Sequence, residues 1–178
     1  MKDLTRAKRI VVKVGSNVLT ARNGLNTVVI DALTHQICHL IDDGRQVLLV
    51  SSGAMAAGMK TLRLDRRPES IPNRQAIAAV GQSGLMHTYE QEFARYGKHV
   101  AQILLTAEDL NIRKRYLNAR NALNTLLSWR VVPIINENDT IMVEEIKLGD
   151  NDNLSAMIAL LMDADALINL TDIGGLFT

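Results

Sequence analysis

Short apolar stretches rich in β-branched residues alternate along this chain with longer segments of helical spacing. The short stretches predict strands at Arg9–Val14, Gln46–Ser51, His99–Leu105, Val131–Ile135 and Ala166–Leu170. The segments between them predict helices at about Thr27–Asp43, directly after SSG at 51–53, and at Arg74–Tyr96, Lys114–Ser128 and Leu154–Met162. Because this alternation is typical of βαβ units, we expect an α/β fold, a three-layer αβα sandwich with a mainly parallel sheet.

Local signals refine these elements. Thr106 and Asp109 have the spacing of a capping box and predict the start of a short helix. Pro133 cannot donate to a sheet ladder, so its strand should lie at an edge or be irregular there. The segment Leu154–Met162 is apolar on nearly every side, which predicts a buried helix. Residues Thr140–Lys147 predict a small hairpin or an extended loop.

Length and composition narrow the class of protein. The chain has 178 residues, 47% hydrophobic and 22% charged, which fits about one globular domain. A net charge of +1 gives no electrostatic case for nucleic acid or an anionic membrane surface. No apolar run is long enough for a membrane span or a signal peptide. The single cysteine, Cys38, cannot form an internal disulfide and is expected in the core. Together these features predict a cytoplasmic protein.

The end of the chain suggests an incomplete domain. After the strand Ala166–Leu170 the sequence continues as TDIGGLFT, with no further helix to cover the sheet. We therefore expect the fold to be incomplete at its C-terminal side.

Small, polar and charged residues follow the predicted strands. In an open α/β sheet, ligands bind in the crevice at the carboxyl ends of the strands. One edge of the sheet is therefore expected to gather Lys13, Gly15, Ser51, Ser52, Gly53, Asn136, Asp139, Asn151, Asp152 and Asp172. This set of side chains suits the binding of phosphate and of an amine.

Each of these groups also has a purely structural interpretation. Lys13 suits anionic oxygens, with Gly15 allowing a phosphate to approach the backbone, but it could equally be an edge lysine in solvent. The helix start after SSG suits a carboxylate or phosphate, but Ser52 could simply be its N-cap. The carboxylates of INEND suit an ammonium or a metal, and also a hydrophilic turn. Asp152 or Asn153 could merely cap the next helix.

Several standard motifs are missing from the sequence. It contains no G-x-x-x-x-G-K-[ST], no G-x-G-x-x-G and no G-x-S-x-G. No His and Cys residues have zinc-ligand spacing, and GDNDN lacks the glutamate that a calcium loop requires. His35 and His39 lie one helical turn apart and are expected on a partly solvated face. We assign no metal site to the protein side chains.

Seven segments in this order resemble the amino acid kinase family. They are VVKVGSNVLT, VSSGAMAAG, AAVGQSGLM, NARNAL, INENDT, EIKLGDNDNLSA and LTDIGGLFT. INEND with GDNDNLSA resembles the branch of that family that phosphorylates the γ-carboxylate of L-glutamate, rather than the acetylglutamate, aspartate or uridylate kinases. The resemblance covers Arg9–Thr178. It implies that residues 1–178 form a truncated amino acid kinase domain, without the rest of the nucleotide-binding lobe or any PUA domain.

The resemblance also implies roles for residues. Lys13 matches the lysine that neutralises the transferring phosphoryl group, and Asp152 matches the aspartate that organises the catalytic lysines. The remaining positions are assigned to L-glutamate (Ser52, Gly53, Asn136, Asp139, Asn151) and, with Lys13, to the nucleotide (Gly15, Thr171, Asp172). Gly15 and Gly53 match backbone donors near the phosphates. The implied cofactors are ATP and Mg²⁺, with proline as feedback inhibitor and a homo-oligomeric dimer or tetramer as the assembly.

Three functions stay open at this point. The first is a kinase for the γ-carboxylate of glutamate, a step of proline biosynthesis. A carboxylate needs no general base because it is already ionised at pH 7, and phosphoryl transfer depends mainly on positioning and charge neutralisation. The second is a non-catalytic module that binds glutamate or proline. The third is a sister kinase for another carboxylate or phosphate.

Overall fold

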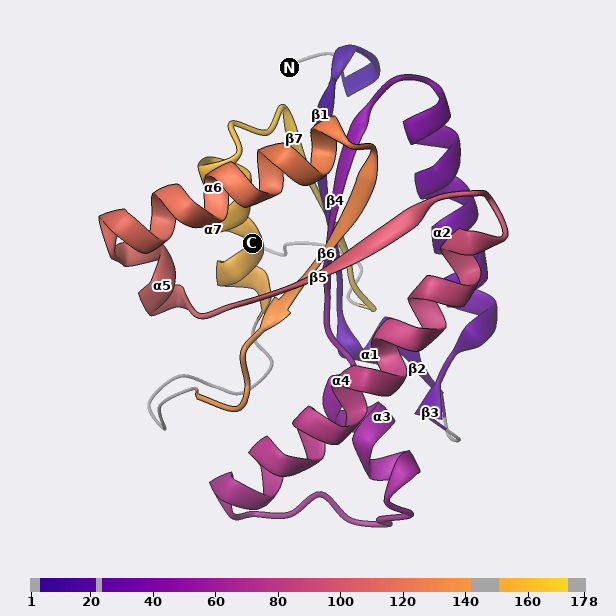
Figure 1. The fold of residues 1–178 in the computed structure, drawn as a ribbon. Helices are drawn as coiled ribbons and strands as arrows, with labels where there is room; N and C mark the ends of the chain where they lie inside the picture. The colour runs from indigo at the N-terminus through magenta and orange to yellow at the C-terminus, as the bar shows by residue number, and fades with distance from the viewer. Residues whose placement is uncertain (1–3, 22–23, 142–150, 173–178) are drawn as a thin grey trace, which may run out of the picture.

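The core of the molecule is a parallel sheet with helices on both faces (Figure 1). The computed structural model describes residues 4–21, 24–141 and 151–172. The five strands lie in the order β5-β6-β4-β1-β7, and every neighbouring pair is parallel. Their bounds are β1 Arg9–Val14, β4 Gln46–Ser51, β5 His99–Leu105, β6 Val131–Glu137 and β7 Ala166–Leu170. The predicted α/β class and parallel sheet are confirmed.

Helices on the two faces cover two separate apolar cores. One face carries α2 Thr27–Asp42 and α4 Ile71–Ala94, with α3 Ala54–Thr61 packed on α4. The other face carries α5 Ala107–Asn111, α6 Arg113–Ser128 and α7 Asn151–Leu161. Shorter elements complete the described chain: η1 Leu4–Arg6, α1 Ser16–Leu19, and a two-stranded antiparallel ribbon of β2 Thr20–Ala21 and β3 Gly24–Leu25.

The alternation of side chains along β1 assigns each residue to one of these cores. Ile10, Val12 and Val14 belong to the core under α2 and α4. Val11 belongs to the core under α5, α6 and α7. Since successive side chains of a strand point to opposite faces, Lys13 shares the face of Val11. It is therefore directed to the side of the sheet that α7 covers.

Helices α3 and α4 cross in backbone contact. A Cβ on Gly81 would lie 1.8 Å from the carbonyl oxygen of Ala54, and one on Gly58 would lie 1.9 Å from that of Ile77. Neither distance is possible for real atoms, so both positions require glycine. The contact sets the position of Ala54, the first residue of α3, directly after the SSG turn.

Pro133 takes the second of its two predicted placements. Its strand is not at an edge, because β6 lies between β5 and β4, but the pairing with β4 begins only at Ile134, one residue beyond the proline. The predicted irregularity is therefore confirmed, whereas one other expectation was wrong. Helix α7 is not buried on every side: Leu160 is 76% exposed, whereas Leu154 and Ile158 are buried.

Other local predictions were closer. The capping box is confirmed, with Thr106 Oγ1 accepting from Asp109 N–H and the Asp109 carboxylate accepting from Thr106 N–H. Helix α4 begins at Ile71, three residues before the predicted start, with a proline in its first turn. Cys38 is buried in the core, and this burial raises the pKa of its thiol to about 11.

Part of the predicted loop Thr140–Lys147 lies outside the described residues. Within the described ranges, no helix has the length and apolar character to cross a membrane.

We expect Gly81→Ala to lower the free energy of unfolding by roughly 1–3 kcal/mol, because the new methyl group overpacks the α3–α4 crossing. Urea denaturation measures this change. Gly84→Ala on the same helix is the matched control, since a Cβ there meets nothing within 4 Å. It should stabilise α4 by up to about 1 kcal/mol through helix propensity. Equal effects of the two substitutions would contradict the close-contact account.

Candidate functional site

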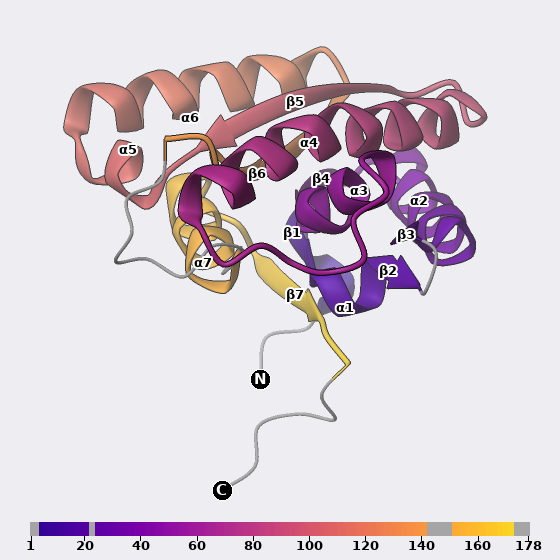
Figure 2. The same ribbon diagram turned by 90° about the horizontal axis from the view of Figure 1, so that it is seen from below.

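A cavity of about 280 Å³ lies at the carboxyl ends of the strands. Its walls come from α1, the start of α3, the segment between α3 and α4, the end of β6 and the start of α7. It is lined by Ser16, Asn17, Thr20, Ser52, Gly53, Ala54, Met55, Ala56, Met59, Arg67, Asn136, Asp139 and Asn151. Figure 2 views the molecule from this end, where the segment between α3 and α4 runs across the strand ends. Five predicted substrate residues therefore share one cavity: Ser52, Gly53, Asn136, Asp139 and Asn151.

The side-chain amide of Asn151 forms the floor of this cavity. Its nitrogen lies 2.9 Å from Ser52 Oγ, 2.9 Å from Asn136 Oδ1 and 3.1 Å from the carbonyl oxygen of Ser51. Asn136 in turn donates to Gln82 Oε1 of α4 at 2.9 Å. Asn151 is 1% exposed, and its Oδ1 atom has no hydrogen-bond partner among the described residues. Asn151 thus uses its amide nitrogen to connect the segments around the cavity, and its carbonyl oxygen stays buried.

The two serines at the end of β4 have different roles. Ser51 Oγ is 2.8 Å from the hydroxyl of Tyr89, a fully buried residue of α4. The Ser51 hydroxyl is therefore a hydrogen-bond partner within the core. Burial raises the pKa of Tyr89 above its usual range. Ser52 lines the cavity. The suggestion that Ser52 is the N-cap of α3 is wrong, because Gly53 occupies that position with φ +105 and no side-chain cap. A residue with a side chain would be strained there.

Asp139 brings a carboxylate to the cavity wall. Burial raises its pKa to about 6, and the nearby Arg67 guanidinium opposes this rise. Arg67 lines the same cavity. Among the residues that the structure describes, no hydrogen bond or ion pair joins Asp139 or Arg67 to a partner. An incompletely solvated carboxylate without a counter-ion is the kind of group that a cationic ligand stabilises.

Lys13 does not line this cavity and is held by Asp152, the residue that follows Asn151 of the cavity lining. Its Nζ is 2.6 Å from Asp152 Oδ1, and the lysine is 9% exposed. The side chain of Asp152 is 65% exposed, so this acid belongs to the surface of α7. The interpretation of Lys13 as an edge lysine is wrong, because β1 lies between β4 and β7. Asp152 follows the first residue of α7 and is part of the helix, so it is not its cap.

Gly15 leaves space next to the lysine. A Cβ there would lie 3.7 Å from Lys13 Nζ and 3.6 Å from the carbonyl oxygen of Leu170. The N–H of Gly15 donates to that same carbonyl oxygen at 3.1 Å. This N–H is therefore occupied, and the expected role of Gly15 as a phosphate donor has no support in its geometry. Its contribution is room around the ammonium.

The end of β7 reaches the same edge of the sheet. Asp172 accepts a hydrogen bond from Asn17 Nδ2 at 3.0 Å. Because Asn17 also lines the cavity, it connects the predicted nucleotide residues Thr171 and Asp172 to the predicted substrate residues. The strand-end rule thus placed both groups at one edge, as the sequence predicted.

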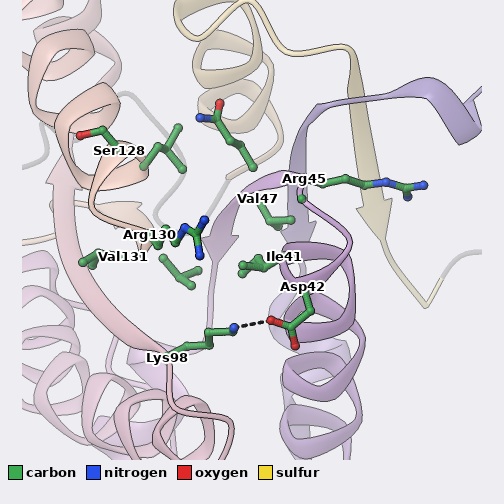
Figure 3. A pocket seen from close by; sticks show the side chains of 12 residues that line it. Ile41, Asp42, Arg45, Val47, Lys98, Ser128, Arg130 and Val131 are labelled. Atoms are coloured by element: carbon green, nitrogen blue, oxygen red, sulfur yellow. Dashed lines mark hydrogen bonds and ion pairs between the residues drawn. The ribbon is translucent and has the colours of Figure 1, made fainter.

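A larger cavity, of about 380 Å³, lies at the other end of the strands, near the first residues of β4 and β6 (Figure 3). It is lined by the first residues of β4 and β6 and by the ends of α2 and α6. Lys98 and Asp42 face each other across it and form an ion pair, so these two charges neutralise each other. None of the predicted site residues lines it. The smaller cavity holds the predicted substrate residues, and we take that one as the functional site.

Sequence reasoning missed three residues that help to form the site: Arg67, Asn17 and Gln82. Arg67 lies in a polar segment whose pattern carries no information about where it folds. Gln82 is a buried polar residue in the otherwise small and apolar stretch AAVGQSG, which was a usable signal. Asn17 directly follows the predicted KVGS strand end and could have been included with it.

Comparison with known proteins identifies relatives across nearly the whole chain. The model of the amino acid kinase family matches residues 8–178. Glutamate 5-kinase of Geobacter sulfurreducens is 56% identical over 175 residues, which cover 98% of this chain and 47% of that relative. The enzymes of the same name from Geobacter metallireducens and Moorella thermoacetica are 55% and 54% identical, over 98% of this chain and 47% of each relative.

The chain therefore spans about half the length of these curated relatives. The parallel αβα sandwich, the strand-end cavity and the match over residues 8–178 agree with one another. The chain belongs to the amino acid kinase family.

Proposed function

We propose that this protein takes part in the ATP-dependent phosphorylation of the γ-carboxylate of L-glutamate to L-glutamyl 5-phosphate, the first step of proline biosynthesis. The observation that carries the proposal is the separation of charges at the strand ends. Asp139 lines the cavity with a carboxylate that has no hydrogen-bond or ion-pair partner among the described residues, and Lys13 brings an ammonium to the same end of the sheet. A ligand with an ammonium at one end and a carboxylate at the other suits this arrangement.

The groups around the cavity suit an acceptor that needs no general base. No histidine is among the described residues that line it. A carboxylate acceptor is already ionised at pH 7 and can attack a phosphoryl group directly. The protein then has to position the acceptor and neutralise charge, which is the usual demand of phosphoryl transfer.

Each predicted substrate residue has a role in this proposal. Asp139 pairs with the α-ammonium of glutamate, and Asn151 contacts the substrate from the same cavity lining. Ser52 and the first N–H groups of α3 contribute donors for a carboxylate, since the start of a helix carries a partial positive charge. Asn136 fixes the orientation of the Asn151 amide.

The nucleotide would lie on the side of Lys13. The donor set fits an anionic ligand, because Lys13 supplies a cation with space at Gly15. Within the described residues no group of three or more His, Cys, Asp or Glu side chains could hold a metal ion, so a divalent cation would be carried by the nucleotide phosphates. MgATP supplies the phosphoryl group when it is bound. Lys13 would neutralise negative charge on the transferring group, Asp152 would hold the ammonium in place beforehand, and Thr171 with Asp172 would contact the nucleotide.

Other parts of the proposal rest on the resemblance to the family. They are feedback binding of proline, assembly into a homo-oligomer and a cytoplasmic location. The names of the relatives state only that they are glutamate 5-kinases. These three properties stay predictions.

The proposal is tested by incubating the protein with glutamate, MgATP and hydroxylamine. An acyl phosphate reacts with hydroxylamine to give a coloured hydroxamate, so hydroxamate that depends on both glutamate and ATP supports the proposal. Its absence, with a melting temperature that responds to glutamate and not to ATP, would favour an amino-acid-binding module instead. Activity on another carboxylate alone would favour a sister kinase.

We expect Lys13→Met to lower kcat with little change in KM for glutamate. The loss of one preorganised charge corresponds to roughly 3–4 kcal/mol of transition-state stabilisation, or about two to three orders of magnitude in rate. The fold should tolerate the change, since Asp152 is largely exposed and stays solvated without its partner. Lys114→Met, on the exposed surface of α6, is the control and should leave kcat unchanged. A wild-type kcat in Lys13→Met would remove Lys13 from the mechanism.

Asp139 should make glutamate binding depend on pH. Only the ionised carboxylate pairs with an ammonium, so affinity should fall as the pH is lowered through about 6, the pKa of Asp139 in the folded protein. Asp139→Asn should weaken glutamate binding and flatten this pH profile. Calorimetric titration between pH 5 and pH 8 measures both effects. An unchanged affinity in the variant would show that another group binds the ammonium.

Asp139→Asn should weaken glutamate binding, but it should make the folded protein more stable when no ligand is bound. The folded-state pKa of Asp139 is raised, so its contribution to stability is present at low pH and is lost as the pH rises through about 6. Above that pH, Asp139→Asn should therefore stabilise the unliganded protein by roughly 1–2 kcal/mol. Urea denaturation at pH 5 and pH 7.5 checks the sign, and a larger gain at pH 5 would contradict it.

A further inference from the structure

Arg67 and Asp139 are opposite charges that line one cavity without pairing. Both contribute to the wall of the strand-end cavity. Their charges interact, since Arg67 lowers the pKa of Asp139 against the effect of burial. Yet neither forms a hydrogen bond or an ion pair with the other, or with any further residue in the described part of the chain. The two charges are close enough to sense each other and remain available to a ligand.

Arg67 is distinguished from its neighbours by this position. The segment between α3 and α4 carries three arginines, Arg63, Arg66 and Arg67, all with exposed side chains. Only Arg67 lines the strand-end cavity among these three. The segment runs across the carboxyl ends of the strands in Figure 2, and Arg67 shares the cavity lining with Asn136 of β6. An arginine that served only to keep the surface soluble would not need to line the cavity.

A negative and a positive group in one wall match the head of an α-amino acid. In that head, the ammonium and the α-carboxylate are separated by a single carbon atom, so a complementary site needs an anion and a cation side by side. An arginine is suited to the carboxylate, because its planar fork can donate two parallel hydrogen bonds. An ammonium is suited to Asp139.

We infer that Arg67 binds the α-carboxylate of the amino-acid substrate while Asp139 binds its α-ammonium, so that the pair recognises the zwitterionic head. This inference rests on the proposed function and adds a specificity residue to it. With the head held at Arg67 and Asp139, at the end of β6, the side-chain carboxylate would extend past the end of β4 toward Lys13 on β1. Arg67 therefore selects α-amino acids over ω-amino acids that have the same reacting end, and Asp139 selects them over dicarboxylates.

Two analogues separate the contributions of the pair. 4-Aminobutyrate keeps the ammonium and the reacting carboxylate of glutamate and lacks the α-carboxylate. Glutarate keeps both carboxylates and lacks the ammonium. Discrimination between glutamate and 4-aminobutyrate reports on Arg67, whereas discrimination between glutamate and glutarate reports on Asp139.

The experiment is isothermal titration calorimetry with glutamate, 4-aminobutyrate and glutarate. Each ligand is titrated into the full-length wild type, Arg67→Ala and Arg66→Ala. In Arg67→Ala, affinity for glutamate should fall by roughly 10- to 100-fold, the range expected for a charge-assisted hydrogen bond. Affinity for 4-aminobutyrate should stay within about twofold, so the preference for glutamate over it should largely disappear. Arg66→Ala should behave as the wild type. Melting temperatures of all three proteins should agree, because both arginines are exposed.

The outcomes distinguish this inference from the proposed function. If the wild type binds glutamate and Arg67→Ala keeps the full preference over 4-aminobutyrate, the role of Arg67 is overturned while the proposed function stands. An equal loss of both ligands also overturns it, because Arg67 would then act on the part that they share. If the wild type binds no glutamate, the proposed function itself fails. Arg67→Lys, which keeps a charge and loses the fork, should retain part of the preference.

Discussion

The amide nitrogen of Asn151 holds together chain segments that are far apart in sequence. It has two protons and lies within 3.1 Å of three acceptors, from Ser51, Ser52 and Asn136, so these bonds are shared. Through Asn136 the network reaches Gln82 of α4. These groups are buried, and losing one partner would leave several polar atoms without hydrogen bonds, which is costly in an apolar interior. The ends of β4 and β6 and the start of α7 are therefore fixed by the same atoms that form the cavity floor.

Packing supplies the second constraint on the site. Backbone contact at Gly58 and Gly81 places α3, and the left-handed conformation of Gly53 turns the chain from β4 into that helix. The alternation of side chains along β1 then directs Lys13 toward α7, where Asp152 meets it. The cavity thus lies between the start of α3, which glycines position, and the start of α7, whose Asp152 holds Lys13 of β1. Positions of polar groups depend on apolar packing that lies outside the cavity.

The sequence predicted most of this arrangement where local pattern determines structure. The β-branched runs located all five strands of the main sheet, and the strand-end rule placed Lys13, Asp139 and Asn151 at one edge. Prediction from the sequence failed where contacts between distant elements determine the position of a side chain. Whether Ser51 or Ser52 faces the cavity depends on Tyr89, a residue of another element. The position of Arg67 depends on how an irregular segment crosses the strand ends, for which no periodicity exists.

The charges at the site differ in how they are balanced, and the difference follows from burial. Lys13 is nearly buried and would be costly without a partner, so Asp152 holds it. Because Asp152 is mostly exposed, water solvates it when the ammonium turns to another anion, and the exchange of partners costs little. Asp139 has no such partner in the described structure, and burial raises its pKa to about 6 against the opposing effect of Arg67. Burial therefore makes the ionised form of Asp139 unfavourable while the cavity is empty. A ligand cation that pairs with the carboxylate offsets part of this free-energy cost on binding.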